Sequence, residues 1–327
     1  MPASLPSPLA TGAIAAAAVP AALYILNRLA GSSKSKRAAL SPSEERVLII
    51  GASSGLGRDL AKKYAARGAK VCVVGRRSEL IVALARECSP SDGDGLGGGD
   101  RCIPVVADAT VAEDMVRVRE RILEAWGGLD TLHICAGVSA LQPVMDLTGA
   151  APGEDATAAG IENVVEITGR ATQGNLVGPL VAALTFIPLL QRTSSYPAIL
   201  LVSSLAAMVG APTRALYGST KAASLLLFQS LAVEHPRITF TFLLPATIEG
   251  NFRASAVDAG PVREADPNKT GLKIGYVADR CIAAVDQQTT GNVFLPFFPN
   301  FLSTLVYTLW PGFVEEKARK KYNFKAS

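Results

Sequence analysis

Histidine is scarce in this chain, and its cysteines are widely spaced. Only His133 and His235 occur among 327 residues, which argues against a histidine-based metal site or a Ser-His-Asp triad. The five cysteines form no Cys-x-x-Cys pair, and three of them lie in apolar, strand-like runs. We interpret them as reduced, buried thiols and predict no metal site.

Charged residues are also few, and the two signs are nearly balanced. The net charge is +4 with no basic cluster inside the predicted domain, so nucleic acid is not an expected partner. Hydrophobic residues make up 49% of the chain, a high value for a freely soluble enzyme. The length allows one large α/β domain, and the expected partners are a hydrophobic small molecule and a membrane.

Charge is missing altogether from Pro8 to Asn27, an alanine-rich stretch. At about 20 residues, this stretch is just long enough to cross a bilayer. Arg28 and further basic residues follow it and none precedes it, so the positive-inside rule places the rest of the chain in the cytosol. We predict a membrane anchor and basic linker at 1–40. A cleaved signal peptide lacks support because the basic n-region is missing. A disordered Ala/Pro-rich tail is the other alternative.

Between residues 41 and 295, apolar runs alternate with amphipathic stretches, which is the pattern of a doubly wound parallel sheet. We predict a single Rossmann-type α/β domain of about seven strands. The expected strands are 46–51, 70–75, 102–107, 129–135, 197–203, 237–244 and 291–295. The expected helices are 56–67, 78–88, 111–126, 160–191, 214–234 and 275–287. The glycine-rich stretch 89–100 is expected to be a surface insertion.

The first expected strand runs into a glycine-rich turn, Gly51-Ala52-Ser53-Ser54-Gly55-Leu56-Gly57. Glycines let the backbone approach a pyrophosphate, which the free N–H groups of the next helix then stabilise. The alternative is a plain structural turn. After the second strand stand Arg76 and Arg77, where an acidic residue would select NAD. A guanidinium suits a 2′-phosphate, so we predict NADP(H), unless both arginines are simply exposed helix-start residues.

A tyrosine and a lysine lie four residues apart in Tyr217-Gly218-Ser219-Thr220-Lys221, with Ser204 thirteen residues before the tyrosine. Positions i and i+4 share a helix face, so the phenol and the ammonium can converge. The cation would lower the pKa of the phenol from roughly 10 and make it a usable proton carrier. Ser204 could then hydrogen-bond a carbonyl or alkoxide oxygen.

Together, the glycine spacing G-x-x-x-G-x-G and the Ser–Tyr–Lys spacing resemble the classical branch of the short-chain dehydrogenase/reductase family. The resemblance covers roughly residues 45 to 295. It points to membrane-associated members related to 11β-hydroxysteroid dehydrogenase and dehydrogenase/reductase member 7. It implies hydride transfer between NADP(H) and the carbonyl or hydroxyl of a hydrophobic lipid, sterol-like or retinoid-like substrate. We therefore expect a membrane protein of the endoplasmic reticulum with its catalytic domain facing the cytosol.

The resemblance also implies roles for single residues. Tyr217 would supply the proton, Lys221 would lower its pKa and bind the nicotinamide ribose, and Ser204 would position the substrate oxygen. Asn175 would complete a catalytic tetrad by holding a water that links Lys221 to solvent; the alternative is an exposed or capping asparagine. The remaining cofactor contacts would come from Asp108 at the adenine, Ala136 and Gly137 beside the cofactor, and the Ile248 backbone at the nicotinamide amide.

Four positions depart from the family pattern, and all are in cofactor-positioning elements. They are Ile50, the pair Ile134-Cys135, Ala246 and Gly250. These changes keep open a second function, a non-catalytic NADP-binding membrane-associated scaffold.

The last segment, 296–327, is predicted to be an apolar, membrane-associating tail with a basic end. Residues 292–314 carry no charge, and three prolines divide them into pieces too short to span a bilayer. An interfacial helix near Leu302–Trp310 would place the following basic residues at lipid headgroups. Alternatively, the tail lines the substrate pocket or makes a dimer contact, so a homodimer is left open.

Overall fold

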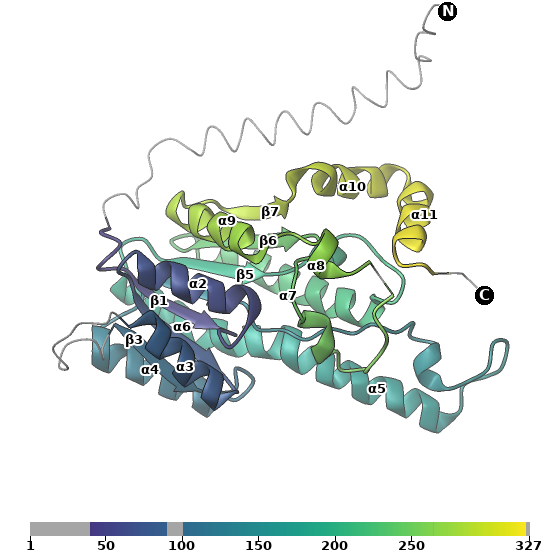
Figure 1. The fold of residues 1–327 in the computed structure, drawn as a ribbon, viewed down its shortest axis with the longest axis horizontal. Coiled ribbons are helices and arrows are strands. Elements are labelled where there is room, and N and C mark those ends of the chain that lie inside the picture. The colour runs from purple at the N-terminus through teal and green to yellow at the C-terminus, as the bar shows by residue number, and fades with distance from the viewer. Residues whose placement is uncertain (1–39, 90–100, 264, 325–327) are drawn as a thin grey trace, which may run out of the picture.

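The centre of the protein is a seven-stranded sheet in which every neighbouring pair is parallel (Figure 1). The structure, a computed structural model, describes residues 40–89, 101–263 and 265–324. The expected anchor at 8–27 and nearly all of the insertion at 89–100 lie outside these residues. The strands are β1 Arg46–Ile50, β2 Lys70–Gly75, β3 Cys102–Val106, β4 Thr131–Ile134, β5 Ala198–Val202, β6 Thr239–Pro245 and β7 Gly291–Leu295.

Helices cover both faces of the sheet, because alternate side chains of each apolar strand point to opposite sides. In β1, Leu48 and Ile50 belong to one buried cluster, whereas Val47 and Ile49 belong to another. The first cluster includes side chains of α4 Ala112–Trp126, α6 Gly178–Thr193 and α7 Ala215–Glu234. The second includes side chains of α2 Gly55–Ala66, α3 Ser78–Cys88 and α9 Ile274–Asp286. The predicted doubly wound Rossmann-type fold is confirmed.

The strand order is β3-β2-β1-β4-β5-β6-β7, so the chain winds in one direction from β1 and then in the other from β4. In open parallel sheets, such a reversal leaves a crevice beyond the carboxyl ends of the strands, where ligands bind. The ends of β1 and β4 flank this point, and the turn after β1 leads directly into α2.

The helix predicted at 160–191 differs from the prediction, because it is interrupted. α5 Ala158–Thr172 and α6 are joined by a π-helical turn, Gln173–Val177. A π turn inserts one residue into an α-helix and is frequent at functional sites. The whole run, 158–193, is the one described helix long and apolar enough to cross a bilayer, but half of its most apolar window is buried in the domain. We interpret it as a core helix.

The tail after β7 folds back onto the domain as two helices, α10 Phe297–Leu309 and α11 Pro311–Lys321 (Figure 1). α10 starts earlier than the interfacial helix predicted near Leu302. Phe301 is 9% exposed, and its ring lies 5.6 Å from that of Phe294 in β7. The tail is therefore anchored to the sheet by aromatic packing. Between β6 and β7, the chain also forms a short helix, α8 Pro267–Thr270.

Candidate active site

The glycine-rich turn after β1 has a backbone that only glycine fits. Gly51 has φ +90°, and a Cβ atom there would lie 2.5 Å from the backbone nitrogen of Ala136. A Cβ on Gly57 would overlap the Gly51 carbonyl oxygen. α2 starts within this turn, and the first N–H groups of a helix lack intrahelical partners. Gly55, Leu56 and Gly57 line the adjoining cavity, so the turn can receive an anionic group.

Arg77 is tied to the hydroxyl groups of this turn. Its Nη2 atom donates to Ser53 Oγ at 2.7 Å and to Ser54 Oγ at 2.8 Å. Arg76 is more loosely held: its side chain is 71% exposed, and its Nη1 lies 3.7 Å from Asp108 Oδ2. The two arginines and the two serines line one end of the cavity, where they form a cationic, hydroxyl-rich pocket.

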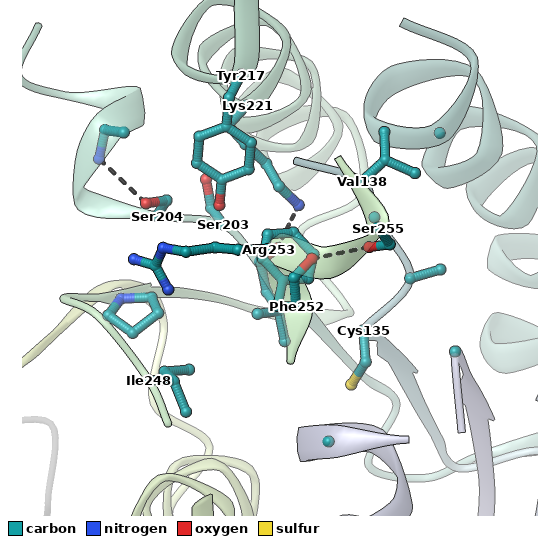
Figure 2. A pocket seen from close by; sticks show the side chains of 18 of the residues that line it. Cys135, Val138, Ser203, Ser204, Tyr217, Lys221, Ile248, Phe252, Arg253 and Ser255 are labelled. Atoms are coloured by element: carbon teal, nitrogen blue, oxygen red, sulfur yellow. Dashed lines mark hydrogen bonds between the residues drawn. The ribbon is translucent and has the colours of Figure 1, made fainter. Parts of the chain in front are cut away.

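Tyr217 and Lys221 lie one turn apart on α7, and both side chains extend into the cavity (Figure 2). Lys221 is 4% exposed and its Nζ donates to the Val202 carbonyl at 3.0 Å, at the end of β5. Burial lowers the pKa of this ammonium from 10.5 to about 8. The predicted convergence of the phenol and the ammonium in one cavity is thus seen.

Ser204 follows β5 and starts the 3-10 turn Leu205–Ala207. Its Oγ accepts a hydrogen bond from the Ala206 N–H at 3.2 Å, so the hydroxyl proton remains able to donate into the cavity that Ser204 lines. Its neighbour Ser203 is 3% exposed and also lines the cavity, and its Oγ has no hydrogen-bond partner within the described residues. Ser203 was not predicted from the sequence, although two adjacent serines directly after an apolar run were a signal that could have indicated it.

Asn175 lies in the π turn and is completely buried. Its Oδ1 accepts from the Val138 N–H at 2.9 Å, and its Nδ2 donates to the Val138 carbonyl and to Thr220 Oγ1, both at 3.0 Å. The alternative interpretation of Asn175 as an exposed or capping residue is therefore wrong. A Cβ on Gly137 would lie 2.9 Å from Asn175 Oδ1 and 3.1 Å from Lys221 Nζ, so glycine is what lets these groups approach. The water predicted between Asn175 and Lys221 stays a prediction.

The other predicted residues line the same cavity, which has a volume of about 1630 Å³. Of the whole predicted set, Asn175 alone does not line it. The residues that do are Gly51, Ser53, Ser54, Gly55, Leu56, Gly57, Arg76, Arg77, Asp108, Ala136, Gly137, Ser204, Tyr217, Lys221 and Ile248.

The positions that depart from the family pattern leave this cavity open. Ile50, Cys135, Ala246 and Gly250 line it, whereas Ile134 is buried in β4. Burial raises the pKa of the Cys135 thiol to about 12, so a neutral group faces the Lys221 ammonium. The cradle formed by these residues therefore still fits a dinucleotide.

The far side of the cavity is formed by a loop and by the tail. Phe252, in the 3-10 turn Phe252–Ser255, lies edge-on to the Tyr217 ring with the centroids 6.1 Å apart (Figure 2). Pro299 and Ser303 of α10 and Val314 and Ala318 of α11 also line the cavity. The tail was expected to lie at the membrane interface or, alternatively, to line the substrate pocket or make a dimer contact. The structure shows that it lines the pocket.

A parallel sheet with a glycine turn at its crevice, and a Ser–Tyr–Lys set beside it, defines an α/β dinucleotide-binding protein. Residues 45–259 match the short chain dehydrogenase family. The chain belongs to the short-chain dehydrogenase/reductase family, whose members are oxidoreductases that bind a nicotinamide cofactor.

Related sequences agree with this membership. The chain is 26% identical over 291 residues to mouse "Dehydrogenase/reductase SDR family member 7B", covering 86% of this chain and 83% of the relative. It is 31% identical over 204 residues to "11-beta-hydroxysteroid dehydrogenase-like 4A" of Arabidopsis thaliana, covering 62% of this chain and 60% of that relative's length.

Solved structures share the fold. An alcohol dehydrogenase from Thermococcus sibiricus complexed with 5-hydroxy-NADP has a TM-score of 0.60 and 21% identity, covering 76% of this chain and 95% of that one. The 3-ketoacyl-(acyl-carrier-protein) reductase of Brucella melitensis complexed with NADH also has a TM-score of 0.60, with 23% identity, covering 77% of this chain and 96% of that one.

The lowered pKa of Lys221 predicts a pH dependence of cofactor binding. Below about pH 8 the ammonium is charged and can donate to a ribose hydroxyl; above it the charge is lost. Affinity for NADH, measured by fluorescence titration, should therefore weaken by about tenfold as the pH rises through this range. In Lys221→Met the affinity should be lower and nearly independent of pH. An unchanged slope in this variant would contradict the assignment.

Proposed function

We propose that the protein is an NADP(H)-dependent reductase or dehydrogenase that acts on the carbonyl or hydroxyl group of a hydrophobic substrate. The observation that supports this most is the meeting of Tyr217, Lys221 and Ser204 with the glycine turn in one cavity. Proton transfer and cofactor binding can then occur side by side.

Each residue has a role that its position allows. The bound cofactor supplies the hydride for carbonyl reduction, or accepts it in the reverse direction. Tyr217 gives its phenolic proton to the carbonyl oxygen, and Ser204 donates a hydrogen bond to the same oxygen. Lys221 lies one turn away on the same face, where its charge stabilises the phenolate that remains. Asn175 keeps the end of β4 against this group through its hydrogen bonds to Val138.

The preference for NADP(H) rests on Arg77 together with Ser53 and Ser54. A guanidinium after β2 and hydroxyl groups in the turn after β1 can bind a 2′-phosphate through charge-assisted hydrogen bonds. Asp108 belongs to the end of β3, where its Oδ1 accepts from the Thr110 N–H and hydroxyl, each at 2.9 Å. As the family resemblance implies, we propose that Asp108 contacts the adenine.

The proposed substrate is a lipid-like, sterol-like or retinoid-like carbonyl compound. Phe252, Pro299, Val314 and Ala318 contribute apolar side chains to the substrate side of the cavity, which basic residues such as Lys317 also line. The mouse relative's name describes a dehydrogenase/reductase and the Arabidopsis relative's name a hydroxysteroid dehydrogenase-like protein, which fits this substrate class.

Membrane attachment is proposed from both ends of the chain. The uncharged segment 8–27 has the length of a membrane span. On the tail, Leu309 is 73% exposed, Trp310 is 66% exposed and Phe313 is 43% exposed, beside the basic last turn of α11. Exposed aromatic side chains next to basic ones suit a lipid interface. The basic residues after segment 8–27 favour a cytosolic catalytic domain, and the endoplasmic reticulum is the membrane we propose.

A second candidate is a non-catalytic NADP-binding scaffold on the membrane. The differences from the family pattern at Ile50, Cys135, Ala246 and Gly250 favour this scaffold, because they lie in elements that position the cofactor. The preserved placement of Ser204, Tyr217 and Lys221 favours the enzyme more strongly, because a scaffold needs no proton donor beside the cofactor.

Replacing Tyr217 by Phe removes the phenolic hydroxyl, and with it the transferable proton, while the ring is kept. Turnover of an accepted ketone should fall by about a thousandfold, while NADPH affinity stays within about twofold of wild type. Steady-state kinetics and fluorescence titration measure the two effects. Lys221→Met should lower both, and near-normal kcat in Tyr217→Phe would refute the acid/base role.

Arg77→Ala should weaken NADPH binding by about tenfold or more, because charge-assisted hydrogen bonds to the 2′-phosphate are lost. NADH binding should change by less than about twofold. Arg76→Ala is the matched control and should have a smaller effect, since Arg76 is 71% exposed. Equal affinity of the wild-type protein for both cofactors would contradict the NADP(H) preference.

Removal of residues 1–40 should weaken membrane attachment, and Leu309→Ser with Trp310→Ser should weaken it further. We expect full-length protein in the membrane pellet after high-salt washing, partial release of the truncated form, and solubility of the combined variant. Leu80→Ser with Val111→Ser, at exposed positions on another part of the domain, is the matched control. Full-length protein in the soluble fraction would contradict the anchor, and protection from protease in sealed microsomes would contradict its orientation.

A further inference from the structure

Arg214 is a buried cation next to the catalytic tyrosine, and the proposed mechanism does not use it. It is the residue before α7, three positions from Tyr217, and is 6% exposed. It also lines the cavity. A buried guanidinium is costly unless it is held by partners, so its contacts should be informative.

Hydrogen bonds to the segment after β4 hold the Arg214 guanidinium. Its Nη1 donates to Ser139 Oγ at 2.9 Å and to the Ala140 carbonyl at 3.1 Å. Ser139 and Ala140 belong to the segment that leaves β4 beside the cofactor-lining Gly137. Arg214 therefore connects the start of the catalytic helix to the loop on the opposite side of the cavity.

The same guanidinium lies against two tyrosine rings. Its Cζ is 5.8 Å from the ring centroid of Tyr217 and 5.7 Å from that of Tyr322. Tyr322 directly follows α11 and is 9% exposed. Both distances are within the range of cation–π attraction. Tyr322, at the end of the tail, thus contacts Arg214, and Arg214 contacts the ring of Tyr217.

We propose that Arg214 is a positioning residue for Tyr217 and that Tyr322 holds Arg214 from the tail, so that the C-terminal tail completes the active site. The proposal rests on the catalytic role of Tyr217 proposed above. Arg214 fixes the Tyr217 ring and adds positive charge beside it. The ring position then determines how the phenol proton meets the substrate oxygen.

Other charged groups also face these rings. Lys221 follows Tyr217 on the same helix, Arg253 lines the same cavity (Figure 2), and Lys321 Nζ lies 5.5 Å from the Tyr322 ring centroid. All are cations, so the effect of Arg214 adds to theirs. Its removal should therefore favour the neutral phenol and shift the pH profile of alcohol oxidation, which needs the phenolate, to higher pH.

The test uses the full-length protein with NADPH and a ketone that wild type reduces, and with NADP⁺ and the corresponding alcohol. Arg214→Met should lower kcat by about tenfold, with KM for the cofactor within about twofold, and should raise the midpoint of the rising oxidation limb by about one pH unit. Arg214→Lys should recover much of the rate. Arg192→Met, at an exposed arginine of α6, is the control.

The tail contribution is tested by Tyr322→Ala and Tyr322→Phe. The alanine variant should lower kcat several-fold, the phenylalanine variant should keep it, and Arg214→Met with Tyr322→Ala should be no worse than Arg214→Met alone. If Arg214→Met does not fold, as shown by its thermal melting, Arg214→Lys and Tyr322→Ala carry the test. Wild-type kcat and an unshifted pH profile in folded Arg214→Met, or wild-type kcat in folded Tyr322→Ala, would overturn the proposal. So would defects of the two variants that multiply in the double variant. A wild-type protein that reduces no carbonyl would instead refute the proposed function.

Discussion

The burial of the Lys221 ammonium is the constraint on which the site depends. A cation that is 4% exposed loses most of its hydration, and its lowered pKa reflects that loss. The surroundings compensate by close approach: the Val202 carbonyl accepts its hydrogen bond, and Gly137 leaves room for it. The π turn brings Asn175 to the same place, where it secures the end of β4. Gly137 and the π turn therefore both help to hold the Lys221 ammonium in the cavity that Tyr217 lines.

The cavity joins parts of the chain that are far apart in sequence. The turn at Gly51, the two arginines after β2, Phe252 and the tail all line it. We propose that the turn and the arginines receive the cofactor and that Phe252 and the tail face the substrate. Tyr217 lies between them on α7. The tail is held in place by Phe301 on the sheet and by Tyr322 against Arg214. Its exposed side chains, such as Trp310, are then directed to a different partner, which we propose to be the bilayer.

Much of this arrangement could be predicted from the sequence, because the signals are short-range. The seven strands are apolar runs and were predicted to within two residues, and the spacing of Tyr217 and Lys221 fixes their common face. The π turn at 173–177 could not be predicted, since one inserted residue barely changes the helical periodicity. The contact of Arg214 with Tyr322 was also missed, because it depends on how the tail returns to α7. Cofactor choice and membrane attachment stay predictions, since they concern partners of the protein.

The measurement that tests the account most directly is the fate of the hydride. NADPH carrying deuterium at the transferred position would be incubated with the full-length protein and a panel of hydrophobic ketones, and the alcohols analysed by mass spectrometry. Hydride transfer in the cavity beside Tyr217 predicts one deuterium on the new carbinol carbon, and none in the Tyr217→Phe protein within the same time. Tight NADPH binding without labelled alcohol from any ketone would contradict the enzyme and favour the scaffold.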